Sequence, residues 1–127
     1  MKFIIDAYSW IEYLEGSKEG EKVYEILKSD NEKFVLLITI AEVVSKVKRK
    51  KGNFILAYES IISNAKVIDI TPKIAKEAGL FHAEIRKKQP SFGIVDAFLI
   101  TTARFINAKV LTGDKHFKNF KEVMLIS

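Results

Sequence analysis

The chain has 127 residues, of which 48% are hydrophobic and 29% charged, a composition typical of a globular domain with one core. It contains no cysteine, which excludes disulfides and thiolate metal sites. No stretch approaches the roughly 18 apolar residues that a membrane span requires, so we expect a single cytoplasmic domain over residues 1–127, with no membrane partner. The net charge of +5 permits an anionic partner such as nucleic acid but does not by itself indicate one.

Short apolar stretches alternate with amphipathic segments along the chain. Phe34–Ile38 is continuously apolar, which is typical of a strand buried on both faces. Thr71 and Pro72 mark a helix start, because threonine caps helices and proline is tolerated in the first turn. In chain order, the pattern predicts a strand at Lys2–Ile5, a helix capped by Ser9 that ends at Gly16, a helix at Glu19–Ser29, a strand at Phe34–Ile38, a helix from Thr39 to the basic end Lys48–Lys51, a helix at Phe54–Asn64, a strand at Val67–Ile68, a helix from Pro72 to about Lys88, a helix at Gly93–Ile106, a strand at Lys109–Thr112, a helical turn at Lys115–Lys118 and a strand at Val123–Ile126.

Strands that alternate with helices imply right-handed crossovers and a parallel sheet covered by helices on both faces. We therefore expect an α/β fold, a three-layer α/β/α sandwich around a central, mostly parallel sheet of four or five short strands. In such sheets, ligands bind beyond the carboxyl ends of the strands. That edge is where a functional site is expected.

Four acids fall at this edge of the predicted sheet. Asp6 ends the first strand, Glu42 follows the second, Asp96 begins the last long helix and Asp114 follows the next strand. Asp6 also fits a helix cap and Asp114 a turn residue, while Glu42 has the capping-box spacing with Thr39. Helix N-termini share the same edge, so location alone does not distinguish a site from a set of caps.

Asp96 gives the clearest indication of chemistry. Its neighbours between Ile94 and Ile100 are apolar at both helical and strand spacing, and a lone buried carboxylate is costly unless it is paired or binds a metal. Asp6 and Asp114 would also converge if the strand order reverses between their strands. Crowded carboxylates repel one another unless a hard cation lies among them. The pattern therefore favours a metal site.

Carboxylate ligands without histidine or cysteine suit Mg²⁺, for which Mn²⁺ can substitute. One or two such ions can activate water and stabilise the leaving oxygen in phosphodiester hydrolysis. The acids therefore predict a metal-dependent nuclease that uses a metal-activated water.

Four blocks of sequence resemble the motifs of PIN domains, in order and over nearly the whole chain. The blocks are Ile4–Leu14, Thr39–Val43, Val95–Arg104 and Val110–Phe117. Their arrangement in a chain of this size most resembles the VapC-type toxins of type II toxin–antitoxin modules. The resemblance implies that Asp6, Glu42, Asp96 and Asp114 bind Mg²⁺ or Mn²⁺ as catalytic residues and that the protein is an endoribonuclease for single-stranded RNA.

The resemblance also implies partners. It suggests a homodimer and a cognate antitoxin whose C-terminal segment packs across the helices and blocks the acidic pocket. Apolar residues of the first helices, such as Trp10, Tyr13 and Leu14, are candidates for that groove, although each also fits the core face of its helix.

One position departs from the commoner PIN pattern, in which a small polar residue often lies two positions after the first acid. Tyr8 occupies that position here, and Ser9 follows it. Ser9 and Thr112 are the candidates for polar support of the acids, with Thr112 better placed just before the last acidic turn.

Other polar residues give weaker indications. Two basic stretches and a lysine beside the last acid fit solvated surface as well as contact with the RNA backbone. His82, His116 and Asp69 are interpreted as surface, core or turn residues rather than as metal ligands or bases. The candidate RNA-binding residues are Lys46, Arg49, Arg86, Lys87 and Lys115.

Three alternatives remain open at this point. The first is a PIN-fold RNA-processing nuclease outside any toxin–antitoxin system, and the second is a PIN fold that only binds RNA or protein. The third is a receiver-type Mg²⁺-binding signalling module, which is similar in length and sheet type. A receiver requires adjacent acids after the first strand and a phosphoacceptor aspartate, whereas this chain has Asp6 alone there.

Overall fold

The computed structural model describes residues 1–127 and contains one five-stranded sheet in the order β3-β2-β1-β4-β5. All four pairs of neighbouring strands are parallel, which confirms the predicted α/β sheet and makes it wholly parallel. The elements are β1 (Lys2–Ile5), α1 (Ala7–Glu15), α2 (Lys18–Leu27), β2 (Glu32–Leu36), α3 (Leu37–Arg49), α4 (Phe54–Asn64), β3 (Lys66–Ile68), α5 (Pro72–Ile85), α6 (Ile94–Ile106), β4 (Lys109–Thr112), the 3₁₀ turn η1 (Lys115–Phe117) and β5 (Val123–Leu125).

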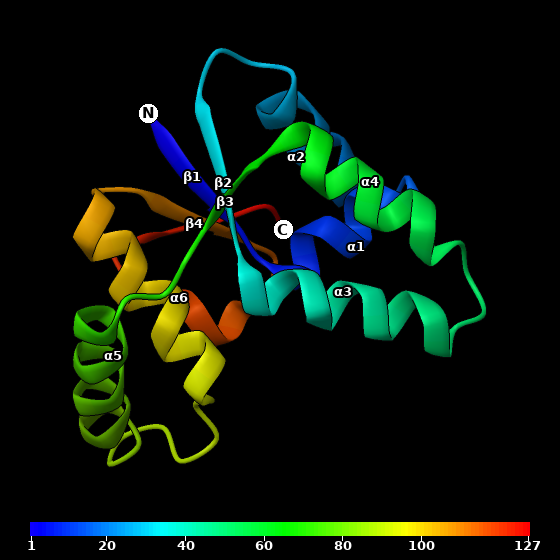
Figure 1. Ribbon diagram of the computed structural model, residues 1–127. Coiled ribbons are helices and arrows are strands. Elements are labelled where there is room, and N and C mark those ends of the chain that lie inside the picture. The colour runs from blue at the N-terminus through cyan, green and yellow to red at the C-terminus, as the bar shows by residue number, and fades with distance from the viewer.

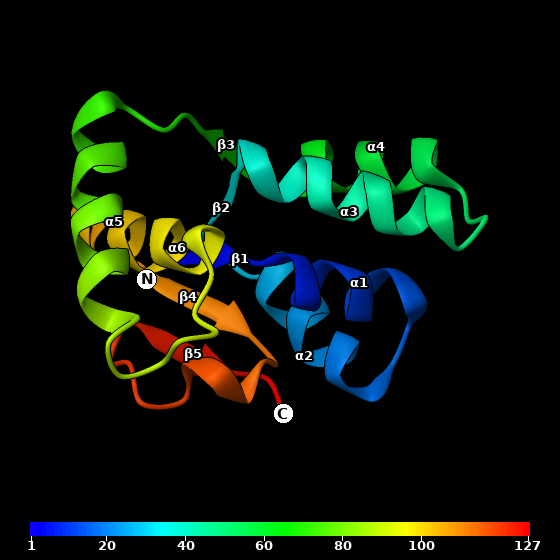
Figure 2. The ribbon, with the colours of Figure 1, turned by 90° about the horizontal axis from the view of Figure 1, so that it is seen from below.

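The helices cover both faces of the sheet, as Figure 1 shows. Successive side chains of a strand point to opposite faces, so Phe3 and Ile5 join the core under α1 to α4, whereas Ile4 joins the core under α5 and α6. All three side chains are almost fully buried. Figure 2 shows α5 and α6 on one side of the strands and the pairs α1–α2 and α3–α4 on the other.

The first helix begins earlier than the sequence pattern predicts. Asp6 is the N-cap of α1, because its carboxylate accepts the backbone N–H of Ser9 at 2.9 Å. The prediction that Ser9 caps this helix is therefore wrong, and its hydroxyl instead donates to the carbonyl oxygen of Leu111 at 2.8 Å. Gly16 ends α1 in the left-handed conformation with φ of 69°, where glycine has no steric penalty.

The boundary between β2 and α3 also differs from the prediction. The strand ends at Leu36 rather than Ile38, and Leu37 begins the helix. The apolar residues continue across the junction, so hydrophobicity alone does not mark where the strand becomes a helix. Glu42 consequently lies in the second turn of α3, and no side chain caps this helix, so the capping-box interpretation of Glu42 is wrong.

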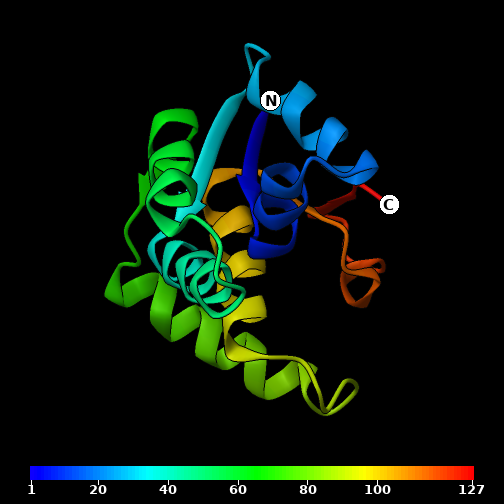
Figure 3. The same cartoon turned by 90° about the vertical axis from the view of Figure 1, so that its right-hand side faces the viewer.

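The remaining elements lie close to their predicted positions. Thr71 caps α5 by accepting the N–H of Ile74, as predicted, but the helix ends at Ile85 rather than near Lys88. Helices α3 and α4 pack against each other and project beyond the sheet, where Figure 3 shows α3 close to α1. No helix is both long and apolar enough to cross a membrane.

Candidate active site

The carboxyl ends of β1 and β4 meet at the centre of the sheet. The N–H of Asp6 donates to the carbonyl oxygen of Leu111 at 3.3 Å, which places the end of β1 beside the end of β4. Strands β2 and β3 lie on one side of β1, whereas β4 and β5 lie on the other. The strand order therefore reverses between β1 and β4. Crevices at such reversals are the usual ligand sites of open parallel sheets.

Asp6 is the most buried of the four predicted acids, with 5% of its surface exposed. Burial raises the pKa of its carboxyl group from 3.8 to about 7. Polar contacts from Thr112 and Ser9 oppose this rise, and the charge of Asp114 adds to it. The Asp6 carboxyl group therefore gains or loses its proton near neutral pH.

Ser9 and Thr112 lie where polar support for the acids was expected. The Ser9 hydroxyl ties α1 to β4 through Leu111, and both residues are fully buried. The Thr112 hydroxyl accepts the N–H of Asp114 at 3.0 Å and also contacts the Asp6 carboxylate. Thr112 therefore orients both acids of this strand pair.

Asp96 lies in the first turn of α6 and is only half-buried. Its Oδ2 accepts the N–H of Gly93 at 3.0 Å, so Asp96 helps to cap the N-terminus of α6. The expectation that Asp96 is enclosed by apolar groups is wrong, because helical geometry turns Ala97 and Ile100 inward and leaves Asp96 partly exposed at the sheet edge. Burial still raises its pKa, while the Gly93 N–H lowers it.

Glu42 and Asp114 lie at the same edge of the sheet, and both residues are exposed. Partial burial, and then repulsion from Asp96, raise the pKa of Glu42. Asp114 is exposed, and its Oδ1 accepts the N–H of His116 at 2.9 Å, which starts η1. Asp114 also raises the pKa of both Asp6 and Asp96 by charge repulsion. The four acids therefore form one electrostatically linked cluster.

The cluster has donor atoms that suit Mg²⁺ or Mn²⁺, namely carboxylate oxygens with two hydroxyls behind them. No three acidic or histidine side chains converge closely enough to form a closed set of ligands. Mg²⁺ does not require one, because it usually keeps several waters and binds through one or two carboxylates. Asp6, with a neighbouring carboxylate, could therefore hold a partly hydrated divalent ion.

Two histidines that sequence reasoning set aside lie close to the cluster. The ring of His116 stacks on Phe92 with centroids 5.3 Å apart, and His82 Nε2 lies 3.0 Å from the Phe92 carbonyl oxygen. Both are packing residues, but positive charge on either one lowers the pKa of Asp96. His116 was detectable as the second residue after Asp114, whereas nothing in the sequence linked His82 to the site.

The five basic residues predicted to contact RNA are all exposed, and they lie on three separate segments of the chain. Lys46 lies one turn beyond Glu42 on α3, and Arg49 follows near the end of that helix. Lys115 directly follows Asp114. Arg86 and Lys87 lie in the loop between α5 and α6, and Lys87 pairs with Glu84 at 3.3 Å.

Gly113, between β4 and Asp114, lies directly against the ring of Tyr8. A Cβ at position 113 would lie 2.1 Å from Cε1 of Tyr8, well inside contact distance. We expect Gly113→Ala to lower the unfolding free energy by about 1–3 kcal/mol, because the ring must move from its hydrogen bond with Glu19. Chemical denaturation measures this loss.

The control for this prediction is the double variant Tyr8→Ala/Gly113→Ala. Removing the ring should suppress most of the Gly113→Ala penalty, since the clash is then absent. If the loss of unfolding free energy in the double variant equals the sum of the losses in the two single variants, the Tyr8 ring is not the cause of the Gly113→Ala loss.

The family of the chain is shown by its sequence. The model of the PIN domain matches residues 3–123, so the chain belongs to the PIN domain family. This membership removes the receiver-module alternative. No curated protein sequence matches the chain.

Solved structures agree with this assignment. The chain is similar to a chain of a toxin–antitoxin complex from Klebsiella pneumoniae, with a TM-score of 0.78, 20% identity and coverage of 98% of this chain and 97% of the other. It resembles equally a chain of VapBC2 from Rickettsia felis, crystallised with promoter DNA, with the same score, identity and coverage. VapC20 of Mycobacterium tuberculosis, described as a toxin that cleaves the sarcin-ricin loop, matches with a TM-score of 0.70, 16% identity and coverage of 95% and 98%. At these identities the likeness shows the fold.

Proposed function

We propose that this PIN domain is an Mg²⁺-dependent endoribonuclease that hydrolyses single-stranded RNA, and that Mn²⁺ can replace Mg²⁺. The observation that carries the proposal is the linked cluster of Asp6, Glu42, Asp96 and Asp114 at the strand-order reversal. Repulsion acts pairwise between these carboxylates, and a bound divalent cation would reduce this cost. A PIN fold that had lost catalysis would have no need to keep this arrangement.

The chain's own residues have separate tasks in this proposal. Asp6, directly after β1, and Asp96, in the first turn of α6, would hold the ion, and Asp114 and Glu42 would add negative charge beside it. Thr112 keeps Asp6 and Asp114 in register through its hydroxyl. When bound, the ion supplies an activated water and charge stabilisation for the leaving oxygen.

The test uses purified protein with a labelled single-stranded RNA. We expect cleavage with Mg²⁺ or Mn²⁺, no cleavage with excess EDTA, and recovery when the ion is restored. Double-stranded RNA and single-stranded DNA of the same sequence serve as comparison substrates and should be cut much less. Cleavage that persists in EDTA, or no cleavage with either ion, would contradict the proposal.

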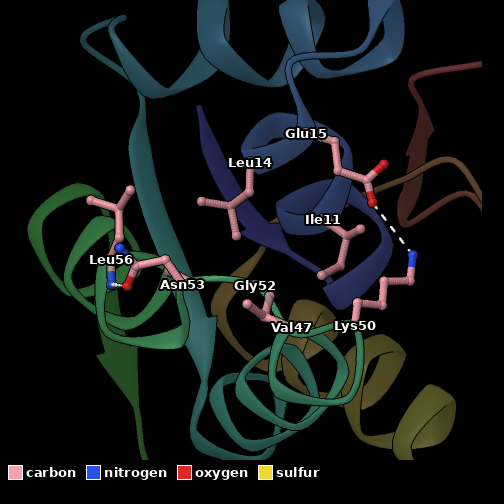
Figure 4. A pocket seen from close by; sticks show the side chains of 9 residues that line it. Ile11, Leu14, Glu15, Val47, Lys50, Gly52, Asn53 and Leu56 are labelled. Atoms are coloured by element: carbon pink, nitrogen blue, oxygen red, sulfur yellow. Dashed lines mark hydrogen bonds and ion pairs between the residues drawn. The ribbon is translucent and has the colours of Figure 1, made fainter.

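We further infer that the protein is the toxin of a toxin–antitoxin pair and acts in the cytoplasm. Support comes from the solved complexes above and from an apolar pocket of about 250 Å³ between α1, α3 and α4. Figure 4 shows this pocket with Ile11, Leu14, Val47 and Leu56 around it and the Lys50–Glu15 ion pair, 3.5 Å long, at its rim. An apolar side chain of an antitoxin segment fits such a pocket.

Of the residues expected to line an antitoxin groove, only Leu14 lines this pocket. Trp10 is fully buried in the core, so of its two interpretations the core face is confirmed and the groove is excluded. Tyr13 packs partly buried against the same core. The proposed homodimer would cover part of the exposed apolar face of α4, which includes Ile55 and Tyr58.

The toxin assignment can fail while the nuclease assignment holds. A PIN-fold RNA-processing nuclease would have the same acids and no antitoxin. A small neighbouring reading frame that encodes a DNA-binding N-terminal segment would support the toxin assignment, and its absence would favour the processing nuclease.

A further inference from the structure

Tyr8 is an exposed aromatic residue at the edge of the acidic cluster. It lies in the first turn of α1, two residues after Asp6, and 39% of its surface is accessible. Its ring rests against Gly113, the residue before Asp114. Trp10, two residues further along the same helix, is fully buried, so exposure is particular to Tyr8 and not general to the aromatic residues of α1.

The ring of Tyr8 is held in place before any ligand arrives. Its hydroxyl donates to Glu19 Oε2 of α2 at 2.9 Å, while Gly113 blocks movement of the ring toward β4. A fixed aromatic side chain loses little conformational freedom when a ligand stacks on it, which favours binding.

The charges around Tyr8 restrict what can bind there. Glu12, Glu19 and Asp114 all lie near its hydroxyl and act on it electrostatically. Three carboxylates repel a phosphate group, so the ring is not a contact for the RNA backbone. A nucleobase is neutral, presents a flat face, and carries amino groups that carboxylates can accept.

We propose that Tyr8 is the residue on which an unpaired nucleobase next to the scissile phosphate stacks. The inference depends on the proposed ribonuclease function, since it assigns a binding contact to the same site. It makes Tyr8 a base-binding residue that supports recognition of single-stranded RNA, because a paired base cannot leave its stack without cost.

The test combines RNA binding and cleavage in a matched set of variants. Tyr8→Phe and Tyr8→Trp keep an aromatic face, whereas Tyr8→Leu removes it and keeps apolar bulk. Tyr24→Leu changes another exposed tyrosine, on α2, and is the control. Binding is measured in the Asp96→Asn background, which prevents cleavage, with a single-stranded RNA that contains 2-aminopurine, whose fluorescence falls on stacking.

We expect Tyr8→Leu to weaken RNA binding and raise KM by about tenfold with little change in kcat, and to abolish the fluorescence change. Tyr8→Phe, Tyr8→Trp and Tyr24→Leu should all stay within about twofold of the parent. If Tyr8→Leu is poorly folded, equal losses in Tyr8→Phe and Tyr8→Trp, which keep the ring, would still overturn the inference.

Two results separate this inference from the proposed function. If the parent protein cleaves RNA, Asp96→Asn does not, and Tyr8→Leu has an unchanged KM, the inference is wrong and the function stands. If the parent protein does not cleave RNA, both fail. A Tyr8→Leu variant that keeps its RNA affinity but loses binding to a protein partner would assign the ring to that partner instead, which also overturns the inference.

Discussion

Asp96→Asn should reduce RNA cleavage by about 100-fold or more while leaving the fold intact. The substitution keeps an oxygen that can accept the Gly93 N–H at the start of α6, so the helix cap survives. It removes the negative charge that repels those of Glu42 and Asp114. Cleavage rates at saturating Mg²⁺, with circular dichroism of each variant, measure the two effects separately.

The matched control for this prediction is Asp69→Asn. Asp69 follows β3 at the same edge of the sheet, is exposed, and lies outside the acidic cluster. The same change of charge there should leave cleavage within about twofold of the parent. Equal losses in the two variants would mean that net charge, and not the cluster, governs activity.

Asp6→Asn should stabilise the metal-free protein at pH 8 and have little effect at pH 4. Burial raises the pKa of Asp6 from 3.8 to about 7, so the native state keeps a proton that the unfolded chain has already released. The unfolding free energy therefore falls as the pH rises from about 4 to about 7. At pH 8, ionisation of the buried Asp6 lowers the unfolding free energy by at most about 4 kcal/mol. The neutral amide of asparagine does not ionise, so the variant should regain much of this stability.

Urea denaturation in EDTA at pH 4 and pH 8 measures this difference. Asparagine retains an oxygen for the Ser9 N–H, so the cap of α1 is preserved in the variant. Asp69→Asn again provides the control for a surface carboxylate. A variant that is destabilised equally at both pH values would show that Asp6 is structural and carries no buried charge.

The sheet and its acidic edge were predictable because two simple patterns specify them. Short apolar stretches such as Lys2–Ile5 alternate with helical segments, which restricts the fold to a covered parallel sheet. Asp6 and Asp114 follow strands that proved to be neighbours. Chain topology alone therefore brought two acids that are distant in sequence to the same edge of the sheet.

Some local details could not be predicted, because the same sequence pattern is compatible with more than one local structure. The apolar residues from Phe34 to Ile38 continue through a strand end into a helix, and no residue type marks the change. Asp96 was expected to be enclosed, yet the start of α6 turns it to the edge and gives it Gly93 as a partner. Its proximity to His82 depends on how α5 packs against α6, which sequence spacing does not encode.

Tyr8 shows a further limit of sequence reasoning. In the sequence, Tyr8 is distinguished only by occupying the position of the usual small polar residue, two positions after Asp6. The contact with Gly113 and the hydrogen bond to Glu19 depend on how α1, α2 and β4 pack together. Only the structure shows that the ring is both fixed and exposed.

The central claim is that the four acids form one divalent-metal site, and calorimetric titration of the metal-free protein with Mn²⁺ tests it most directly. The parent protein should bind Mn²⁺ more tightly at pH 8 than at pH 6 and release protons near pH 7, because the ion displaces the proton on Asp6. Asp6→Asn and Asp96→Asn should each weaken binding by about tenfold or more, while Asp69→Asn binds like the parent. Equal Mn²⁺ affinity in the parent and Asp6→Asn proteins, without proton release, would contradict the claim.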